Sequence, residues 1–357
     1  MIKCFDSDIS SKEKKALNEI IDSRILAFGP KVEEFENQYK AHSKKKYNIG
    51  FNSASSAAYL LYQYLYEKYG KCRVYTTSLG FVSPVTAAIK NNHDVVYVDV
   101  DDNLLMSSQD LEQKFINDNV KSVIMPVLYG GVSYIPGFED FCNEKSAILV
   151  LDSAHCISPN MNYDFAFYSF HPVKPICMSN GGLLATNDEE ASRFMFSGRN
   201  FGREQMGDTY DLSQIGYNFY MNNLNASLGL AQLEKCELNV KKRRNNFNFL
   251  VSKIPQNLGY FTEHDEASSY YLSSLVLKNS FYSANMRKYL RDKNIQSSFH
   301  YPFLHASSYY KVEYGLDKLD SLKDRIINLP IHQNLTQEEL EKIAYECIHY
   351  SRGGSKS

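Results

Sequence analysis

One lysine in this chain lies in a setting that suits covalent chemistry. Lys174 belongs to "SFHPVKPICMSNGG", directly after the apolar run 165–170, with Pro172 and Pro175 on either side. The two prolines restrict the backbone around it. A lysine at the edge of a dry site can lose its proton and attack a carbonyl carbon to form a Schiff base. The alternative is a solvated surface lysine, which is the usual state of this residue.

A carboxylate and a histidine follow another apolar run, "LVLDSAH" at residues 149–155. Asp152 ends the run, and His155 comes shortly after it. A carboxylate at the carboxyl end of a strand can accept a charged hydrogen bond from a ligand's ring nitrogen and keep that nitrogen protonated. Asp152 could equally cap the turn that follows, and the sequence leaves both roles open.

Small hydroxylated residues open a helix candidate in "NSASSAAYLL" (52–61), directly after an apolar run. Free N–H groups and hydroxyls at the positive end of a helix dipole can bind phosphate, although an ordinary serine cap fits as well. The spacing of a P-loop is absent. In chain order, a phosphate site, a carboxylate for a ring nitrogen and a Schiff-base lysine together indicate pyridoxal phosphate, with three unrelated structural features as the alternative.

The elements that must position these residues alternate between strand and helix. The strand candidates are 47–51, 72–77, 95–100, 122–128, 147–152, 165–170 and 182–186, and the helix candidates are 53–69, 83–92, 109–118, 136–145 and 188–197. Apolar strands between helices predict an α/β domain with a mostly parallel sheet. Ligands of such sheets bind at the carboxyl ends of the strands, which is where the residues above fall.

The character of the sequence changes beyond residue 220. A long helix is expected near 220–251, followed by a strand at 270–277, a helix near 283–293 and a final helix that opens with the capping-box pair Thr336 and Glu339. We therefore predict two domains, a large cofactor-binding domain at 1–235 and a small C-terminal domain at 236–357, joined by the long helix.

Composition excludes several classes of function. The 357 residues carry a net charge of −2, so no overall positive field recruits nucleic acid, and the basic run 241–244 fits a solvated helix face. No apolar stretch is long enough to span a membrane or to act as a signal peptide. The seven cysteines are scattered without CxxC pairs, which favours reduced thiols in the cytoplasm over disulfides or a metal site.

The chain resembles the DegT/StrS-type family of sugar aminotransferases, which are pyridoxal-phosphate enzymes of the type I fold. The resemblance runs in order through "FGPKVEEFE" (28–36), "NSASSAA", "TTSLGFVSP" (76–84), "LDSAH", "SFHPVK", "GYNFYMNNLNASLGLAQL" (216–233), "FHYPFLH" (299–305) and "INLPIHQNLTQEELEKIA" (327–344). It implies the PLP-dependent transferase type I fold, with a mostly parallel central sheet in a large domain and a smaller C-terminal α+β domain.

The resemblance also implies roles for individual residues. Lys174 would bind the cofactor covalently and move the substrate proton, Asp152 would pair with the pyridinium nitrogen, and His155 would lie near the phenolic oxygen. The remaining cofactor residues would be Phe81 stacked on the ring, Ala54, Ser55 and Ser169 at the phosphate, and Asn218 at the phosphate of the neighbouring subunit. A homodimer with shared active sites follows from the role of Asn218.

The same resemblance implies transfer of an amino group from L-glutamate to a nucleotide-linked keto-deoxysugar, in the cytoplasm, for cell-surface polysaccharide such as O-antigen. The motif "SFHPVK" favours a 4-keto-6-deoxyhexose. The candidate substrate residues are His300, Tyr301, His305 and Arg199, with Arg203 beside the last. A packed aromatic turn at 299–305 and solvated arginines are the alternatives.

Three departures from the family pattern bear on substrate specificity. Tyr220 stands where the family has arginine, Asn180 stands where it has an acidic residue, and a hairpin expected between "LDSAH" and "FAFYSF" is missing. Three other activities remain open: a sugar dehydratase, against which Lys174 counts, a 3-keto-sugar aminotransferase, whose glycine-rich motif is absent, and a non-catalytic cofactor-binding regulator, which would need a separate basic domain.

Overall fold

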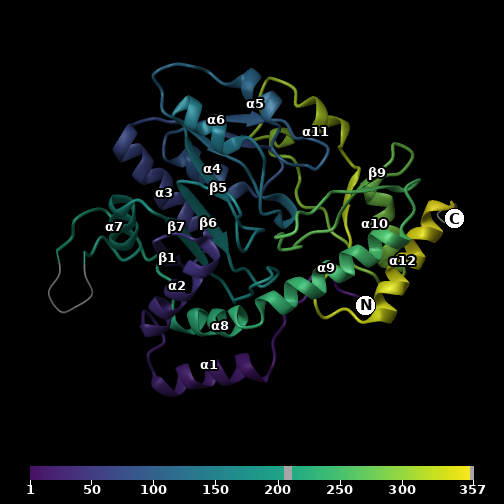
Figure 1. Ribbon diagram of the computed structural model, residues 1–357, viewed down its shortest axis with the longest axis horizontal. Helices are drawn as coiled ribbons and strands as arrows, with labels where there is room; N and C mark the ends of the chain where they lie inside the picture. The colour runs from purple at the N-terminus through teal and green to yellow at the C-terminus, as the bar shows by residue number, and fades with distance from the viewer. Residues whose placement is uncertain (205–210, 354–357) are drawn as a thin grey trace.

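A seven-stranded sheet forms the centre of the larger part of the protein in this computed structural model, which describes residues 1–204 and 211–353 (Figure 1). Its strands are β1 (Tyr47–Phe51), β2 (Arg73–Thr77), β3 (Asp94–Val98), β4 (Ser122–Met125), β5 (Ile148–Asp152), β6 (Phe165–Ser169) and β7 (Gly182–Thr186), in the order β1-β7-β6-β5-β4-β2-β3. β7 runs antiparallel to both of its neighbours, and the other pairs are parallel. The predicted α/β fold with a mostly parallel sheet is therefore confirmed.

Helices cover both faces of this sheet, which explains why its strands are apolar on both sides. The helices of the larger part are α1 (Ser11–Ser23), α2 (Pro30–Ser43), α3 (Ala54–Tyr69), α4 (Val82–Lys90), α5 (Ser108–Lys114), α6 (Phe138–Lys145), α7 (Glu189–Gly198) and α8 (Asn223–Leu233). α3, α4 and α7 pack on one face, where Leu61 and Met195 meet Val150. α2 and α8 pack on the other face, where Phe35 lies in one core with Tyr168.

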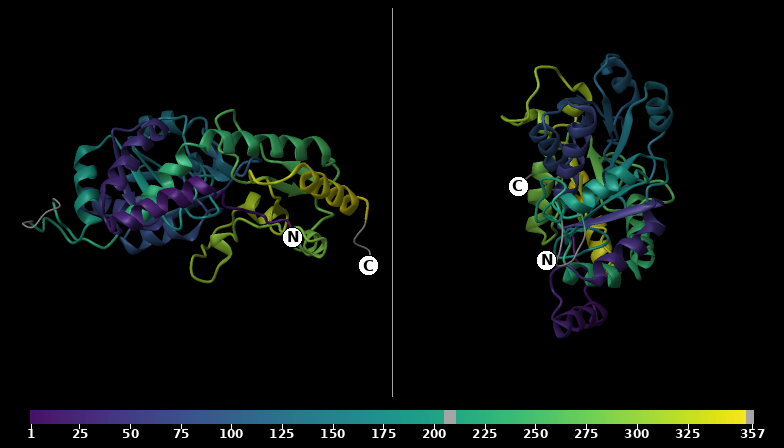
Figure 2. Two further views of the ribbon diagram at one scale, coloured as in Figure 1. Left: turned by 90° about the horizontal axis from the view of Figure 1, so that it is seen from below. Right: turned by 90° about the vertical axis from the view of Figure 1, so that its left-hand side faces the viewer.

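The smaller part is built around a second, antiparallel sheet in the order β10-β9-β8. Its elements are α9 (Cys236–Lys253), β8 (Gly259–Phe261), β9 (Ser274–Leu277), α10 (Ser283–Asp292), β10 (Ile326–Asn328) and α12 (Gln337–Ser351), whereas α11 (Asp317–Ser321) packs against the larger part. The predicted capping box is present: the Thr336 side chain accepts from Glu339 N–H, and the Glu339 carboxylate accepts from Thr336 N–H. Figure 2 shows the two parts side by side along the long axis of the molecule.

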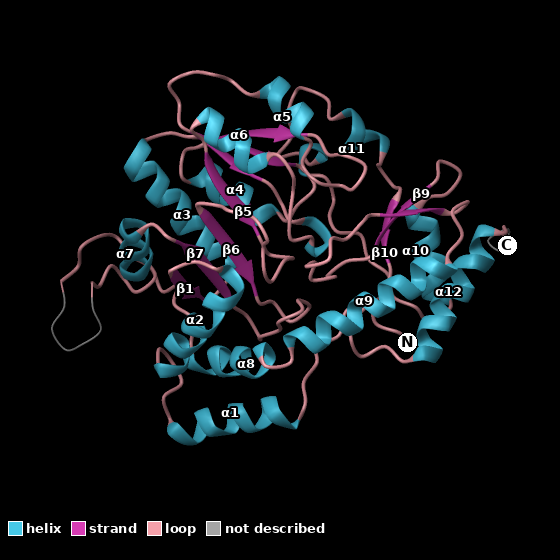
Figure 3. Cartoon of the chain, viewed as in Figure 1, coloured by secondary structure: helices cyan, strands magenta, loops and turns pink. Residues whose placement is uncertain are grey.

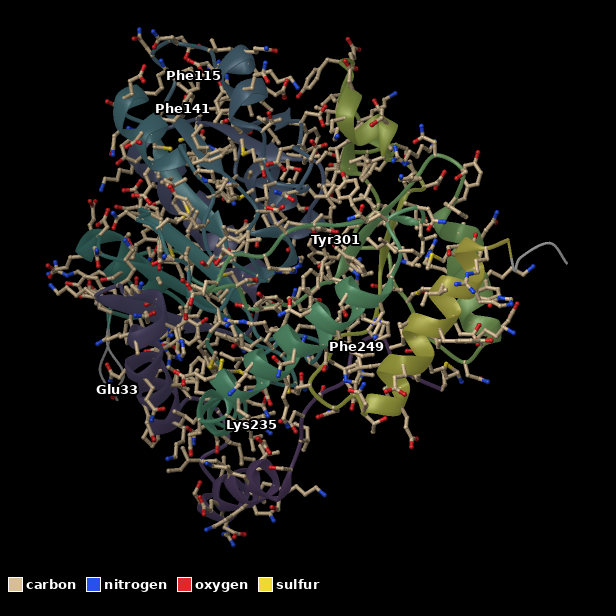
Figure 4. All side chains as sticks on the ribbon, turned by 45° about the vertical axis from the view of Figure 1, so that its right-hand side comes forward. Glu33, Phe115, Phe141, Lys235, Phe249 and Tyr301 are labelled. Carbon is tan, nitrogen blue, oxygen red and sulfur yellow. The ribbon has the colours of Figure 1, made fainter. Side chains whose placement is uncertain are left out.

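Two helices replace the single long helix that was expected over 220–251. α8 ends at Leu233 and α9 begins at Cys236. The break lies at Lys235, whose ammonium pairs with Asp8 at 2.9 Å and with Glu13 at 2.6 Å (Lys235 is labelled in Figure 4). Both partners belong to the N-terminal segment, whose helix α1 lies along the outer side of α8 (Figure 3). The two carboxylates bind the lysine at the turn between the helices, and the sequence around residue 235 does not reveal them.

The segment between α10 and β10 leaves the small sheet and contacts the large one. Leu304 N–H donates to the Ser78 carbonyl at 3.1 Å, and Lys318 N–H donates to the Asp99 carboxylate at 2.7 Å. The N-terminus crosses in the opposite direction, because Ile2 N–H donates to the Asn294 carbonyl at 2.8 Å. Segments from each side of residue 235 thus contact the part on the other side. The boundary between two domains at this residue stays a prediction.

Other expectations concern absences. In the part of the chain that the structure describes, no helix is long and apolar enough to cross a membrane. The same residues contain no group of three His, Cys, Asp or Glu side chains that could hold a metal ion. The seven cysteines are all free and buried.

Candidate active site

Three strand ends define the edge of the large sheet at which the predicted site residues gather. Asp152 is the last residue of β5, and Ser169 is the last residue of β6. β1 ends at Phe51, and helix α3 begins three residues later at Ala54. Because β1, β5 and β6 point the same way, their carboxyl ends lie at one edge. The parallel sheet thus brings together residues that are about a hundred positions apart.

Lys174 lies in the loop that connects β6 to β7. Its backbone N–H donates to the His171 carbonyl at 2.8 Å, which closes a turn around Pro172. The side chain is only 8% exposed, and its Nζ lies 4.1 Å from the centre of the Tyr271 ring. With the described residues, the ammonium forms neither a hydrogen bond nor an ion pair. The lysine is therefore buried, as predicted, and free of the partners that would fix its charge.

Burial brings the pKa values of Lys174 and Asp152 closer together. Desolvation lowers the pKa of Lys174 from 10.5 to about 7, partly opposed by the attraction of Asp152. Desolvation also raises the pKa of Asp152 from 3.8 to about 6, partly opposed by the Ala154 N–H and by Lys174. The Ala154 N–H lies 3.0 Å from Asp152 Oδ1. Both shifts bring the two pKa values toward neutrality, which suits a base beside an acidic partner.

The start of α3 forms the cradle predicted for phosphate. Ser53 caps the helix by accepting from Ser56 N–H at 3.1 Å. The N–H groups of Ala54 and Ser55 and the Ser55 hydroxyl make no hydrogen bond within the described residues, so they remain available to an anion. Gly182 closes the cradle from below, because a Cβ on it would lie 2.2 Å from Ala54 N. The glycine pair therefore serves the close approach of β7 to the helix.

An aromatic wall faces Lys174 from the other side; it consists of Phe5, Tyr129, Tyr271, His300 and Tyr301. The ring centres of Phe5 lie 5.5 Å from Tyr271 and 5.1 Å from His300. Those of His300 and Tyr301 are 4.6 Å apart, and the Tyr129 hydroxyl donates to the His300 carbonyl. Tyr301 is labelled in Figure 4 between the two parts of the molecule. The wall draws its members from segments far apart in sequence.

His155 links the sheet edge to this wall. Its Nε2 lies 2.9 Å from the Tyr301 hydroxyl, whereas its Nδ1 is buried without a partner among the described residues. Burial and the nearby charge of Lys174 hold the pKa of His155 well below its usual value, so the ring is neutral near pH 7. Phe81 lies beyond, 52% exposed, with its ring centre 5.6 Å from that of Tyr301. The structure therefore groups His155, Phe81, His300 and Tyr301 with Lys174.

Two predicted substrate residues are engaged elsewhere. Arg199 is 1% exposed and forms an ion pair with Glu36, and it also donates to the Gly50 carbonyl at 2.5 Å. His305 is bonded to Ser78 at 2.6 Å and to Asp320 at 3.1 Å. Both side chains tie segments of the fold together, and neither belongs to the group around Lys174. Local sequence marks the residue types but not the carboxylates that meet them.

Asn218 lies on the surface near the cradle. It is exposed, it forms an isolated bridge with Asn200, and its carbonyl accepts from Asn52 Nδ2 at 3.0 Å. Tyr220, the residue in place of the family arginine, packs edge-on against Phe28 with ring centres 5.9 Å apart. Arg203 stacks over Phe201 at 5.4 Å. These residues flank positions 205–210, which lie outside the described part of the chain.

The other departures also have local explanations. Residues 153–164 connect β5 directly to β6 without strand or helix, so the expected hairpin is missing from the fold as well. Asn180 is exposed, and its Oδ1 accepts from Gly181 N–H at 3.1 Å. Tyr271 is the site residue that sequence reasoning missed. Nothing in "SSYYLSS" distinguishes it from a core tyrosine.

The residues present fit pyridoxal phosphate. The cradle at Ala54 and Ser55 offers unpaired N–H donors, and Asp152 offers a buried carboxylate for a ring nitrogen. The unpaired Nδ1 of His155 is a buried polar atom that lacks a partner in the described chain. Buried polar groups of this kind usually have a partner, so these orphaned groups favour a polar ligand.

Comparison with known proteins gives one family and a consistent set of relatives. The model of the DegT/DnrJ/EryC1/StrS aminotransferase family matches residues 7–347. The chain is 27% identical over 360 residues to the UDP-4-amino-4,6-dideoxy-N-acetyl-beta-L-altrosamine transaminase of Helicobacter pylori, covering 95% of each chain. It is 26% identical to the GDP-perosamine synthase of Vibrio cholerae, covering 98% of each.

Solved structures agree with this fold. PseC from Helicobacter pylori, an aminotransferase involved in the biosynthesis of pseudoaminic acid, superposes with a TM-score of 0.91 at 24% identity, over 98% of this chain and 99% of that one. The putative sugar aminotransferase Spr1654 from Streptococcus pneumoniae gives a TM-score of 0.90 at 22% identity, over 99% and 100% of the two chains.

Proposed function

This chain belongs to the DegT/DnrJ/EryC1/StrS aminotransferase family, and we propose that it transfers the amino group of L-glutamate to the keto group at carbon 4 of a nucleotide-linked 6-deoxyhexose. Its cofactor is pyridoxal phosphate. The observation that carries the proposal is the meeting of Lys174, Asp152 and the α3 cradle at one edge of the sheet. The names of relatives that form 4-amino sugars, among them the Saccharopolyspora spinosa dTDP-4-dehydro-2,3,6-trideoxy-D-glucose 4-aminotransferase, support carbon 4.

Asp152 and the cradle would hold the cofactor. When bound, pyridoxal phosphate supplies an aldehyde that condenses with amines and a protonated ring that withdraws electrons from the neighbouring carbon. The carboxylate of Asp152 would hold a proton on the ring nitrogen, because the opposite charges stabilise each other in a buried site. The N–H groups of Ala54 and Ser55, with Ser169 at the end of β6, would bind the phosphate.

Lys174 would move the proton in both halves of the reaction. Its amine would take the proton from the α-carbon of the amino donor and deliver it to the carbon that was the cofactor's aldehyde, so that the nitrogen stays with the cofactor when 2-oxoglutarate leaves. The reverse transfer then aminates the keto-sugar. A pKa of about 7 leaves the amine able both to accept and to release that proton at neutral pH. The neutral His155 would lie near the phenolic oxygen of the cofactor ring. The hydroxyl of Tyr301 would contact the sugar.

A homodimer with shared sites completes the proposal. Asn218 is exposed close to the cradle, and the segments on either side of residues 205–210 expose the apolar side chains of Phe201, Leu212 and Ile215. We place Asn218 at the phosphate of the second copy. Light scattering should give twice the mass of the chain, and a monomer at working concentration would refute this arrangement. We place the reaction in the cytoplasm, on a route to cell-surface polysaccharide, and the free cysteines support the former.

The absorption spectrum of the purified protein with pyridoxal phosphate tests the activity. L-Glutamate should bleach the visible band of the lysine-bound cofactor, and nucleotide-linked 4-keto-6-deoxyhexoses should restore it. Matched 3-keto sugars serve as the control. A visible band that is indifferent to glutamate would refute the donor, and recovery with 3-keto sugars alone would refute carbon 4. No visible band at all would refute the role of Lys174.

A further inference from the structure

The aromatic ring of Tyr271 contacts the ammonium group of Lys174. Nζ lies 4.1 Å from the centre of the ring, which is the distance at which the negative face of an aromatic ring attracts a cation. Within residues 1–204 and 211–353 the ammonium forms no hydrogen bond and no ion pair. Among the described residues, no hydrogen bond joins the buried Tyr271 hydroxyl to the lysine. The face of the ring, and not its polar tip, therefore meets the lysine.

The Tyr271 ring is held in place by its surroundings. The N–H groups of Tyr271 and Leu272 both donate to the Gly130 carbonyl, at 2.9 and 3.0 Å. The ring is 1% exposed and packs between Phe5, at 5.5 Å, and His155, at 4.5 Å. Gly131 lies against its backbone with φ of +100°, and a Cβ there would meet Tyr271 N at 3.1 Å. The ring is thus a fixed platform and not a mobile side chain.

One carboxyl group and three histidines also interact with Lys174. Asp152 attracts the ammonium from β5. The other titratable groups that interact with Lys174 are His155, His171 and His300, from three different segments. Burial lowers the pKa of each of them, for His300 to about 4, so all three are neutral near pH 7. The ring face and one carboxylate set the environment of the amine.

We propose that Tyr271 is a positioning residue of this aminotransferase: the face of its ring holds the Lys174 ammonium whenever that amine is not bonded to the cofactor. A carboxylate in hydrogen-bond contact would hold the ammonium more tightly and make its proton harder to release. The ring face attracts the cation without accepting its protons in directed bonds, so the amine stays near the reacting carbon and remains able to leave. The proposal rests on the assignment of Lys174 as the cofactor lysine.

Three variants separate the ring face from the hydroxyl and from packing. Tyr271→Phe keeps the ring and removes the hydroxyl, and Tyr271→Leu removes the ring. Phe5→Leu makes the same loss of an aromatic ring at a neighbour of Tyr271, 5.5 Å away between ring centres, and removes no contact that the structure gives Lys174. Lysine labelled with ¹³C at Cε allows Lys174 to be titrated by NMR in the cofactor-free protein, with Lys174→Arg identifying its signal. Tyr271→Met replaces the leucine variant if that protein does not fold.

The wild type, Tyr271→Phe and Phe5→Leu should titrate at the same pH. Tyr271→Leu should titrate about one pKa unit lower, because the ring face stabilises the charged amine. With cofactor and glutamate, Tyr271→Leu should lose about tenfold in kcat, and the acid limb of its pH profile should move down by the same unit. An unshifted Tyr271→Leu, an equal shift in Phe5→Leu or a loss of activity in Tyr271→Phe would overturn the proposal. A shifted titration in a protein that glutamate leaves inert would instead refute the proposed function alone.

Discussion

The two sides of the candidate site are assembled in different ways. The sheet edge delivers Asp152, Ser169 and the α3 cradle from the ends of parallel strands, and Lys174 follows on the next loop. The aromatic wall gathers Phe5, Tyr129, Tyr271, His300 and Tyr301 from separate segments, through ring contacts and single hydrogen bonds. On the sheet edge each group has its own chemical task. On the wall, several contacts share one task, which is to position the reacting groups.

This difference predicts how the two sides respond to mutation. Removing a group from the sheet edge should abolish a chemical step and leave the fold intact. Removing a group from the wall should give a graded loss, because neighbouring contacts remain.

The largest effect is expected at Lys174. Lys174→Ala removes the amine that moves the proton, and turnover should fall by about 10⁴-fold or more. The fold should be retained, because the ammonium has no hydrogen bond or ion pair among the described residues to lose. Release of 2-oxoglutarate from glutamate measures the first half-reaction, and circular dichroism checks the fold. A Lys174→Ala protein that turns over at the normal rate would contradict the sheet-edge assignment.

Asp152→Asn should separate activity from stability. The neutral amide cannot hold a charge against a ring nitrogen, so turnover should fall by about 10²-fold or more. The cofactor-free variant should be more stable than the wild type at pH 7. Burial raises the pKa of Asp152 from 3.8 to about 6, which corresponds to a cost of about 3 kcal/mol for the ionised form.

The pH dependence of this stability difference provides a control, because the difference should depend on whether the Asp152 carboxyl is ionised. The native carboxyl keeps its proton to a higher pH than the unfolded one, so wild-type stability falls as pH rises through that interval. Asp152→Asn lacks this contribution. Denaturant unfolding at pH 7 and near pH 4 should therefore show a difference between the two proteins that is large at the higher pH and small at the lower. A variant less stable at pH 7 would contradict the account of Asp152 as a strained functional group.

The neighbouring glycines offer a matched pair for the cradle. A Cβ on Gly182 would lie 2.2 Å from backbone atoms of Ala54 and Ser53, whereas a Cβ on Gly181 would meet the Met178 sulfur at 2.8 Å, a flexible side chain that can move. Gly182→Ala should displace the start of α3, lower the free energy of unfolding by about 1–3 kcal/mol and weaken cofactor binding at least tenfold. Gly181→Ala should change both much less. Equal effects would show that the close approach of β7 to α3 is not what the glycine pair provides.

The sequence predicted the sheet edge well because its signals are local. Apolar runs that stop at Asp152 and Ser169, and small residues that open α3, reveal strand and helix ends, and parallel topology then brings those ends together. Even so, the strand predicted to reach residue 128 ends at Met125, and beyond Pro126 only an isolated bridge between Val127 and Asp152 continues the pairing with β5.

The wall and the helix connections depend on long-range contacts that no local pattern records. Tyr271 reaches Lys174 because Gly130 and Gly131 hold its backbone, and those glycines lie about 140 residues earlier. The break between α8 and α9 lies at Lys235, and the carboxylates that pair with this lysine are near the N-terminus. Arg199 and His305 were predicted at the substrate by residue type, yet Glu36 and Asp320 engage them. Residue type alone does not reveal which partner lies nearby.

The smallest effect that still distinguishes the two sides is expected at Tyr301. Tyr301→Phe removes the hydroxyl that lies 2.9 Å from His155 Nε2, and it keeps the ring that contacts Phe81. The His155 ring loses one hydrogen-bond partner but keeps its packing, so its position should change only slightly. We therefore expect kcat to fall by about five- to tenfold with the fold unchanged.

Tyr310→Phe is the matched control, because it also removes one hydroxyl from the segment that returns to the large sheet. That hydroxyl is bonded to Thr86 at 2.7 Å, away from Lys174. The control should lower stability by about 1 kcal/mol and leave kcat unchanged. If Tyr301→Phe instead abolished turnover as Lys174→Ala should, the hydroxyl would carry a proton in the reaction, and the wall would belong with the sheet edge as chemical machinery. If both phenylalanine variants left kcat unchanged, His155 would be oriented by its ring contacts with Tyr129, Tyr271 and Tyr301 and not by the Tyr301 hydroxyl.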